Sequence, residues 1–496
     1  MRQLLATKSI GVLHEQESSG NQLRRALGWV HLTLLGIGGV IGTGIFVLTG
    51  TAAANYAGPA LPLSFIVAGI GCTLAAFCYA EFAAMIPVSG SAYSYSYATL
   101  GEAIAWFIGW NLVLEYLFAV ATVSVGWSGY AVSLLDQLGV HLPAALSNAP
   151  LGTPMGKEGL SIVRTGAVLN VPAVVIVAVL ATICYTGIKQ SAAFNAVIVA
   201  IKVTIVVLFI LFGVSFIQPS NWQPFVPPNA GHFGVFGWSG IMRAAGVIFF
   251  AYIGFDAIST AAQETRNPQR DMPIGILASL IICTVLYVLV SAILTGMVNY
   301  KDLDVAAPVA LALDRYPALH WLGIPVKFGA VCGMTSVMLV MTIAQARIFF
   351  AMARDGLLPP FFGRVHPRFR TPSTGTAITG VSAAIVGGLF PVNLLGEMVA
   401  IGTLAAFVTV CIGVLVLRQT RPDLPRPFRA PWPWFTCIAG ALVCFSMMVS
   451  LGTPTWLRLA IWTAIGVVIY LLYGYSHSKV RAENGTAGGV SPAPTL

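Results

Sequence analysis

Charged side chains are scarce in this sequence. Asp, Glu, Lys and Arg make up 9% of its 496 residues, whereas hydrophobic residues make up 57%. A soluble globular chain carries about 25% charged residues, so a water-exposed surface cannot be built from this composition. The composition therefore excludes soluble, disordered and fibrous proteins and predicts an integral membrane protein. The net charge of +9 does not indicate a nucleic-acid partner, because the positive residues lie in short loops between apolar runs.

Signals of catalysis are missing as well. All eight cysteines lie within apolar runs, and their spacing matches no zinc-binding pattern. The seven histidines are scattered, and the sequence contains no nucleophile–base motif and no phosphate-binding loop. Residues 1–28 are polar and mixed, without the apolar stretch of a cleavable signal peptide. We therefore expect neither an enzyme nor a bound cofactor or metal.

Long apolar runs are abundant instead. A helix needs about 20 residues to cross about 30 Å of hydrocarbon, and twelve runs of the sequence are long enough. The fold class predicted is therefore all-α integral membrane, with twelve transmembrane helices in a lipid bilayer. The runs are 29–49, 61–86, 102–135, 171–187, 192–217, 238–263, 272–298, 325–353, 373–390, 394–417, 434–451 and 456–475.

The even number of helices places both termini on one side of the membrane. Most of the 26 Lys and Arg residues lie in segments on the side of the N-terminus. Cytoplasmic loops carry an excess of these residues, so we expect both termini to be cytoplasmic. Twelve helices with short tails are typical of a bacterial protein of the inner (plasma) membrane, and the tail 476–496 is polar.

The first helix contains an unusual run of glycine. Five of the nine residues from Gly36 to Gly44 are glycine, and each costs about 1 kcal/mol relative to alanine in a helix. One interpretation is close helix packing through small residues. The other is a broken helix, whose second half begins near Thr43 and whose N–H groups bind an anion such as a carboxylate.

The sixth helix contains a similar interruption. Gly254 is followed by Asp256, which suits the N-cap of a new half-helix beginning at Ala257. Paired breaks of this kind are typical of inverted-repeat transporters, which bind substrate at the midplane. We therefore expect a five-plus-five inverted repeat with helices 1 and 6 broken and two extra helices. The predicted units are 1–28 (N-terminal segment), 29–217 (first repeat), 238–417 (second repeat), 434–475 (helices 11 and 12) and 476–496 (tail).

Two ionisable residues lie deep inside predicted helices. Lys202 lies about ten residues, or ~15 Å, from the nearer end of helix 5, and a lysine there is expensive. It either snorkels to the interface or serves as a functional amine beside the carbonyl groups of helix 1, where desolvation favours release of its proton. Glu115 lies well inside helix 3 and either pairs with a buried donor or joins the binding site.

Several longer motifs resemble one known family. The sequence is similar to the amino acid–polyamine–organocation (APC) superfamily, and within it to the cationic amino acid transporter branch, over roughly residues 20–475. The motifs that carry this resemblance are Gly42-Thr43-Gly44-Ile45-Phe46, Tyr79-Ala80-Glu81-Phe82, Pro87-Val88-Ser89-Gly90-Ser91-Ala92-Tyr93, Glu264-Thr265-Arg266-Asn267-Pro268-Gln269-Arg270-Asp271-Met272-Pro273 and Arg354-Asp355-Gly356-Leu357-Leu358-Pro359.

The resemblance implies secondary transport of amino acids and a set of site residues. It places Lys202 at the position of the proton-coupling lysine of bacterial members, so that a proton gradient drives transport. Phe250 would also act as a gate over the substrate. The substrate-binding residues implied are Ile41, Thr43 and Gly44 at the carboxylate, Phe250, Ala251 and Ile253 at the amino group, Glu115, Asp256 and Tyr287 near the side-chain end, and also Ile45.

One substrate-site position departs from the arginine and lysine carriers of this branch. They have a small polar residue in helix 8 where this sequence has Met341. A methionine there either fills a packing gap or shortens the pocket, which favours neutral L-amino acids such as alanine. The expected function is proton-coupled symport of an L-amino acid. The competing hypotheses are an exchanger, a carrier of cationic amino acids and a membrane amino acid sensor. The sequence does not decide whether a small single-helix accessory subunit is a partner.

Overall fold

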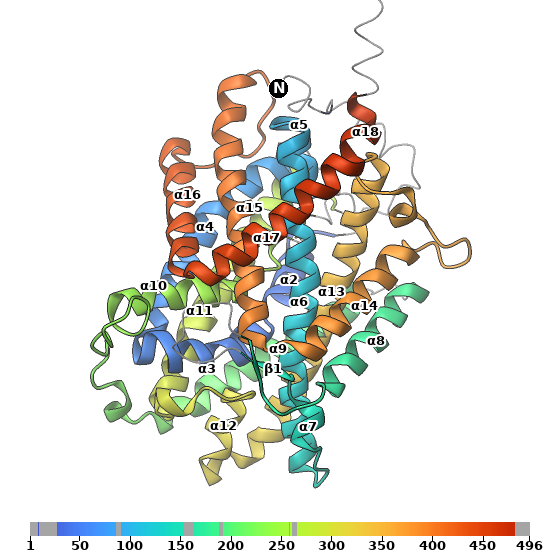
Figure 1. The fold of residues 1–496 in the computed structure, drawn as a ribbon. Helices are drawn as coiled ribbons and strands as arrows, with labels where there is room; N and C mark the ends of the chain where they lie inside the picture. Colours follow the sequence, from blue (N-terminus) through green and yellow to red (C-terminus); the bar gives the residue numbers. More distant parts are fainter. Residues whose placement is uncertain are drawn as a thin grey trace, which may run out of the picture.

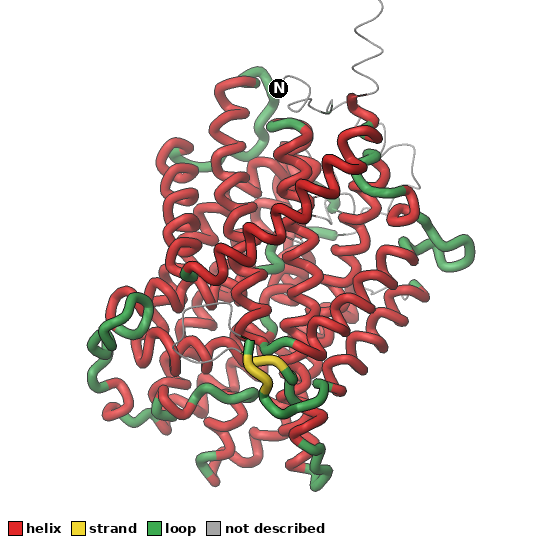
Figure 2. Tube along the Cα trace, in the orientation of Figure 1, coloured by secondary structure: helices red, strands yellow, loops and turns green. Residues whose placement is uncertain are grey.

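The computed structural model describes residues 8, 27–85, 91–152, 162–187, 192–256, 258–259 and 265–481. This part of the chain is a bundle of helices whose loops gather at its two ends (Figures 1 and 2). Its sheet has two short antiparallel strands, β1 (Leu151–Gly152) and β2 (Val163–Arg164), with Leu151 opposite Arg164.

Each of the twelve predicted runs overlaps a helix of the structure, which confirms the all-α membrane class. Within the described residues, eight helices are long and apolar enough to cross a membrane by themselves. Shorter or interrupted helices make up the remaining spans. In chain order the twelve spans are α2 (Trp29–Val40) with η2 (Gly44–Leu48), α3 (Thr49–Ala52) and η3 (Ala53–Ala57); α4 (Leu61–Met85); α6 (Glu102–Gln137); α8 (Val171–Thr186); α9 (Ala192–Gly213); α10 (Gly237–Ile248) with η7 (Phe249–Tyr252); α11 (Pro268–Met297); α13 (His320–Arg354); α14 (Ser373–Leu389); α15 (Val392–Thr420); α16 (Pro433–Ser450); and α17 (Thr453–Ile469) with η12 (Tyr470–Gly474) and α18 (Tyr475–His477).

Short helices connect these spans. Most lie in the loops at one end of the bundle, where Figure 1 shows α7 and α12. The short helices are η4 (Gly58–Ala60), α5 (Ser91–Thr99), α7 (Ala144–Ser147), η5 (Val214–Phe216), η6 (Pro219–Trp222), η9 (Tyr300–Asp302), α12 (Pro308–Asp314), η10 (Pro317–Leu319) and η11 (Pro360–Gly363).

Some helix ends differ from the prediction. Helix 8 begins at His320 and contains Pro325, where the sequence analysis placed its first residue. Proline favours the first turn of a soluble helix, but membrane helices tolerate it further in because neighbouring groups satisfy the freed backbone. Helix 7 begins at Pro268, and its first turn carries Asp271, so this turn extends past the apolar run.

Lys8 and Arg481, the first and last residues that the structure describes, lie at the same end of the bundle, which we name the termini end and which α5 and α18 mark in Figure 1. Lys8 Nζ donates to Asp355 Oδ1 at 2.6 Å, directly after α13. At the same end Arg481 forms an ion pair of 3.0 Å with Glu102, the first residue of α6. The other end, with α7 and α12, is named the loop end.

Candidate functional site

Helix 1 is broken where the glycine run predicted a break. α2 ends at Val40, and Ile41 is extended with φ −72° and ψ 104°. The helix resumes with Thr43 as N-cap of η2. The first N–H groups of a helix have no partner within it, and they carry partial positive charge. The break therefore places the N–H groups of a helix start in the middle of the bundle.

Helix 6 is broken as well. η7 ends at Tyr252, Ile253 is extended with ψ 137°, and Gly254 has φ +116°. This φ lies in the region that glycine adopts without steric cost, so the glycine is required at the turn. The half-helix predicted from Ala257 falls largely outside the described residues, and the N-cap role of Asp256 therefore stays a prediction.

The two breaks touch through glycines. A Cβ atom added to Gly44 would lie 2.3 Å from the Cα of Ala251, and one added to Gly39 would lie 3.2 Å from the carbonyl oxygen of Gly254. Side chains at these positions would push the two broken helices apart. Both interpretations of the glycine run therefore hold, because the same segment breaks helix 1 and packs it closely against helix 6.

A small cavity of about 10 Å³ lies between the breaks. About 10–15 Å³ is the room that one water molecule needs, so the site is closed in this conformation. The sequence analysis named five of its lining residues: Thr43, Gly44, Phe250, Ile253 and Met341. The remaining lining residues, which it missed, are Gly39, Val40, Gly42, Ala119, Val123 and Val337.

Three of the six missed residues follow helical spacing from predicted ones. Ala119 and Val123 lie four and eight residues after Glu115 on α6, and Val337 lies four residues before Met341 on α13. Residues four apart share one helix face. Extending each predicted face by one or two turns would therefore have found them.

Four predicted residues lie beside the cavity without lining it. Ile41, Ile45, Ala251 and Tyr287 are buried. The Tyr287 hydroxyl lies 2.9 Å from the carbonyl oxygen of Val40 and 3.0 Å from that of Ala251. Tyr287 thus contacts both breaks at once, and one of the two lone pairs of the Ala251 carbonyl is occupied.

Lys202 on α9 is fully buried and aimed at the break in helix 1. Its Nζ donates to the carbonyl oxygens of Gly38 at 2.6 Å and Ile41 at 3.0 Å. The stem packs against α13 at Gly333, where an added Cβ would lie 3.1 Å from Lys202 Cε. This geometry excludes snorkelling, because the amine ends on backbone carbonyls inside the bundle.

The two predicted acidic residues lie outside the lining. Glu115 and Asp256 are both buried, and Asp256 Oδ2 accepts a hydrogen bond of 2.6 Å from the hydroxyl of Tyr116. Ala119 lies one turn of α6 beyond Glu115 and lines the cavity. Glu115 is therefore one helical turn away from the site.

Comparisons with known proteins show the family of this chain. The family model described as amino acid permease matches residues 27–473. The methylthioribose transporter of Bacillus subtilis is 47% identical over 481 residues, which cover 97% of this chain and 100% of that protein. The branched-chain amino acid permease BcaP of the same organism is 47% identical over 475 residues, covering 96% and 98%. The vacuolar cationic amino acid transporter 4 of Arabidopsis thaliana is 37% identical over 424 residues, covering 85% of this chain and 68% of that protein.

The fold and its broken helices are those of a membrane transporter, not of an enzyme. The chain belongs to the amino acid permease family. Its similarity to the bacterial permeases and to the plant transporter places it in the cationic amino acid transporter branch of the APC superfamily, whose members share a twelve-helix membrane fold.

Proposed function

We propose that this permease carries L-amino acids by proton-coupled symport, with a preference for neutral ones such as alanine. The observation that carries the proposal is the pair of hydrogen bonds from Lys202 to Gly38 and Ile41. They join the one lysine inside α9 directly to the break in helix 1.

The coupling follows from the charge of the amine. A protonated amine makes charge-assisted hydrogen bonds, which are about twice as strong as neutral ones, so the charged lysine fixes the carbonyls of the break. Loss of the proton weakens these bonds and releases helix 1. Proton binding and the position of the substrate-binding helix are therefore linked, as symport requires.

The substrate lies between the two breaks in this proposal. Its carboxylate binds N–H groups at the start of η2, at Thr43, Gly44 and Ile45. Its amino group binds carbonyl oxygens of Phe250, Ala251 and Ile253 at the break in helix 6. Because the cavity holds about 10 Å³, substrate binding requires that the helices separate, with the Phe250 ring as the gate.

The preference for neutral substrates rests on the lining. Its side chains are apolar apart from Thr43, and Met341 and Phe250 supply the largest of them. A guanidinium group would need a buried carboxylate, yet Glu115 and Asp256 do not line the cavity. In this proposal Glu115 and Asp256 therefore hold the helices around the site in place and do not bind the substrate.

The relatives supply a second candidate cargo. One relative is named a methylthioribose transporter and another a branched-chain amino acid permease. A neutral thioether sugar and a branched apolar side chain both suit an apolar lining. Transport of cationic amino acids and exchange without a proton would each give a different pattern of uptake.

The test is uptake of radiolabelled L-alanine into liposomes with and without an inward proton gradient. Unlabelled L-leucine, L-arginine and methylthioribose are added separately in excess. Stimulation by the gradient, with competition by leucine and none by arginine, supports the proposal. Competition by arginine indicates a cationic carrier, uptake only into loaded vesicles indicates an exchanger, and competition by methylthioribose alone indicates the sugar.

We also propose how the chain is oriented in the membrane. Residues 29–217 and 238–417 form the two inverted repeats, and the termini end faces the cytoplasm of a bacterial cell. The loop end is then the outer side. Protease treatment of right-side-out vesicles should leave a tag on the C-terminus intact. Cleavage of the tag would show that the C-terminus lies outside and that the orientation is the opposite of the one proposed.

A further inference from the structure

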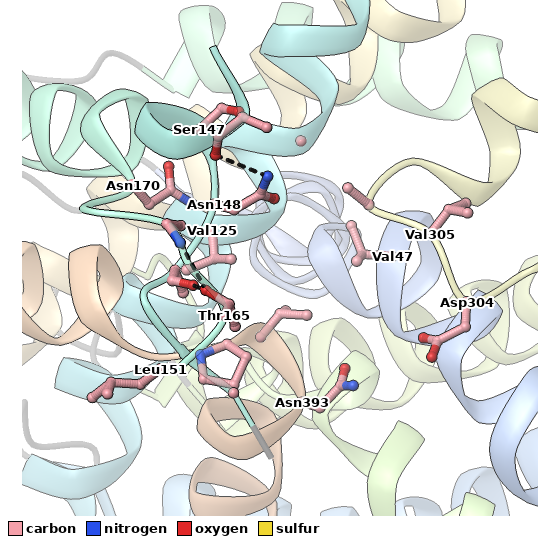
Figure 3. Close-up of a pocket in the computed structure, with 18 of the residues that line it drawn as sticks. Val47, Val125, Ser147, Asn148, Leu151, Thr165, Asn170, Asp304, Val305 and Asn393 are labelled. Carbon is pink, nitrogen blue, oxygen red and sulfur yellow. Dashed lines mark hydrogen bonds between the residues drawn. The ribbon is translucent and has the colours of Figure 1, made fainter. Parts of the chain in front are cut away.

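A second and much larger cavity lies at the loop end of the bundle (Figure 3). Its volume is about 560 Å³, enough for a small ligand. Its lining comes from the second half of helix 1, from α6 and from the loops around β1, α12 and α15. It includes Val47, Val125, Asp304, Val305 and Asn393.

The two cavities lie in series along the same helices. Thr43 lines the small cavity, and Val47, one turn further along helix 1, lines the large one. On α6, Val123 lines the small cavity and Val125 the large one. The large cavity therefore lies nearer the loop end than the breaks do.

The lining of the large cavity has a single sign of charge. Within the described part of the chain, Asp304 is its one charged residue, and the other polar groups are amides and hydroxyls. Asp304 Oδ1 accepts from Thr51 at 3.1 Å, and Oδ2 accepts from Asn55 at 3.2 Å. These two donors hold the carboxylate in place on the lining. Figure 3 shows Asp304 with Val305 and Asn393 among the residues that line this cavity.

A second acceptor lines the same cavity. The side-chain oxygen of Asn393, at the start of α15, is buried and has no hydrogen-bond partner among the described residues. A buried acceptor without a partner costs about 1–3 kcal/mol. Because this oxygen is buried, a ligand reaches it only when the Asn393 side chain turns toward the cavity. An ammonium group, which has three N–H donors, would then satisfy it.

We propose that this cavity is an outer subsite that takes an amino acid by its ammonium group, with Asp304 as the counter-charge and Asn393 as a neutral acceptor. Val47, Val125 and Val305 supply apolar contact for the side chain. The subsite rests on the proposed function, because it assumes an amino acid as cargo. It selects against anions, which a carboxylate repels.

The first test measures the charge preference of the cavity without transport. Val305 is 40% exposed, and the variant Val305→Cys, purified in detergent, is labelled with a cationic or an anionic methanethiosulfonate reagent. The native cysteines are buried or half-buried, and labelling of the unmodified protein gives the background. We expect faster labelling by the cationic reagent.

The charge variants decide whether Asp304 causes this preference. Asp304→Asn should lower the cation-to-anion rate ratio about thirtyfold. A unit charge ~4 Å away in water attracts the cationic reagent by ~1 kcal/mol and repels the anionic one by the same amount, a factor of about six for each. Asn393→Asp should raise the ratio. Asp302→Asn is the matched control, since Asp302 lies two residues away, pairs with Arg315 and does not line the cavity. A ratio that Asp304→Asn leaves unchanged, or that Asp302→Asn changes equally, would overturn the proposal.

The second test is transport. Asp304→Asn should raise the KM for L-alanine several-fold and leave the maximal rate near that of the unmodified protein, because the bound state at the breaks is intact. An unchanged KM with uptake intact would overturn the subsite alone. Failure of the proposed function is distinguishable, because the unmodified protein would then take up no L-amino acid at all.

Discussion

The side-chain amine of Lys202 lies 2.6 Å from the carbonyl oxygen of Gly38, in the last turn of α2. The same amine reaches Ile41, on the other side of the point where α2 ends. A charged group in a bilayer is tolerated only when it is paired or bonded to backbone carbonyls. The backbone carbonyls at the break therefore accept the hydrogen bonds of the Lys202 amine, and the amine in turn holds the two sides of the break in place.

The close approach of the two breaks can be tested with Gly44→Ala. The added methyl would lie 2.3 Å from the Cα of Ala251, and overpacking of this kind costs about 1–3 kcal/mol. We expect a lower thermal midpoint and little L-alanine uptake. Gly375→Ala on α14 is the matched control, since its added methyl meets neighbours at 3.6 Å; equal loss in both variants would contradict this account.

The bridging hydroxyl can be tested with Tyr287→Phe. This change removes the one hydroxyl proton, which the carbonyl oxygens of Val40 and Ala251 share at 2.9 and 3.0 Å, and loss of a buried partner costs about 1–3 kcal/mol. Uptake should fall several-fold. Tyr252→Phe provides the comparison. The Tyr252 hydroxyl donates to the backbone carbonyl oxygen of Phe65 on α4, so it does not connect one break to the other. Transport is expected to be affected less in that variant, and the reverse order would count against the bridging role.

The substrate preference can be tested with Met341→Ala. Removing the side chain enlarges the apolar cavity, so larger amino acids should compete better for L-alanine uptake. Met338→Ala on the same helix loses similar buried volume, but Met338 does not line the cavity. We expect both variants to lose stability by about 2–5 kcal/mol, and only Met341→Ala to change the order of competitors. An unchanged order would remove Met341 from the site.

The contacts at the termini end predict that Glu102 and Arg481 contribute to stability as a pair. Glu102 is fully buried and accepts from Tyr470 at 2.8 Å, from Tyr97 at 3.0 Å and from Ser478, besides its ion pair with Arg481. Burial and the Glu102 carboxylate raise the pKa of Tyr97 above its ordinary value, so its hydroxyl stays a donor at neutral pH. Arg481→Ala leaves the buried carboxylate without its counter-charge, a loss of about 3–5 kcal/mol.

The matching measurement is a double-mutant cycle on the thermal midpoint. Adding Glu102→Gln to Arg481→Ala should recover part of the lost stability, because no buried charge then remains. If the two losses simply add, the ion pair does not hold the C-terminal segment to α6.

Much of the fold could be predicted because its signals are local. The apolar runs give the helices by length, and the glycines before Thr43 give the break in helix 1. The partners of buried polar groups could not be predicted. Tyr116 and Asp256 are 140 residues apart, and their contact depends on how each helix is rotated. Helices that are apolar on every side carry little information about rotation, so the sequence alone does not fix such contacts.

The site shows the same limit. The positions of the breaks were predicted, because glycine and an ionisable residue stand out in an apolar run. The binding roles of residues such as Phe250 and Met341 came only from the family resemblance. Ala119 and Val337 are ordinary apolar residues, and only their position on a helix face brings them to the cavity. The large cavity was not predicted either, since Asp304 lies in a loop and Asn393 at the start of α15, far from it in the sequence.

The most direct test of the central claim compares Lys202→Ala with the unmodified protein in the same liposomes. Both are assayed for L-alanine uptake driven by an inward proton gradient and for counterflow into alanine-loaded vesicles without a gradient. Counterflow shows that the variant is folded and binds substrate. We predict that Lys202→Ala retains counterflow and loses stimulation by the gradient. Strong acid-stimulated uptake by Lys202→Ala would contradict the account.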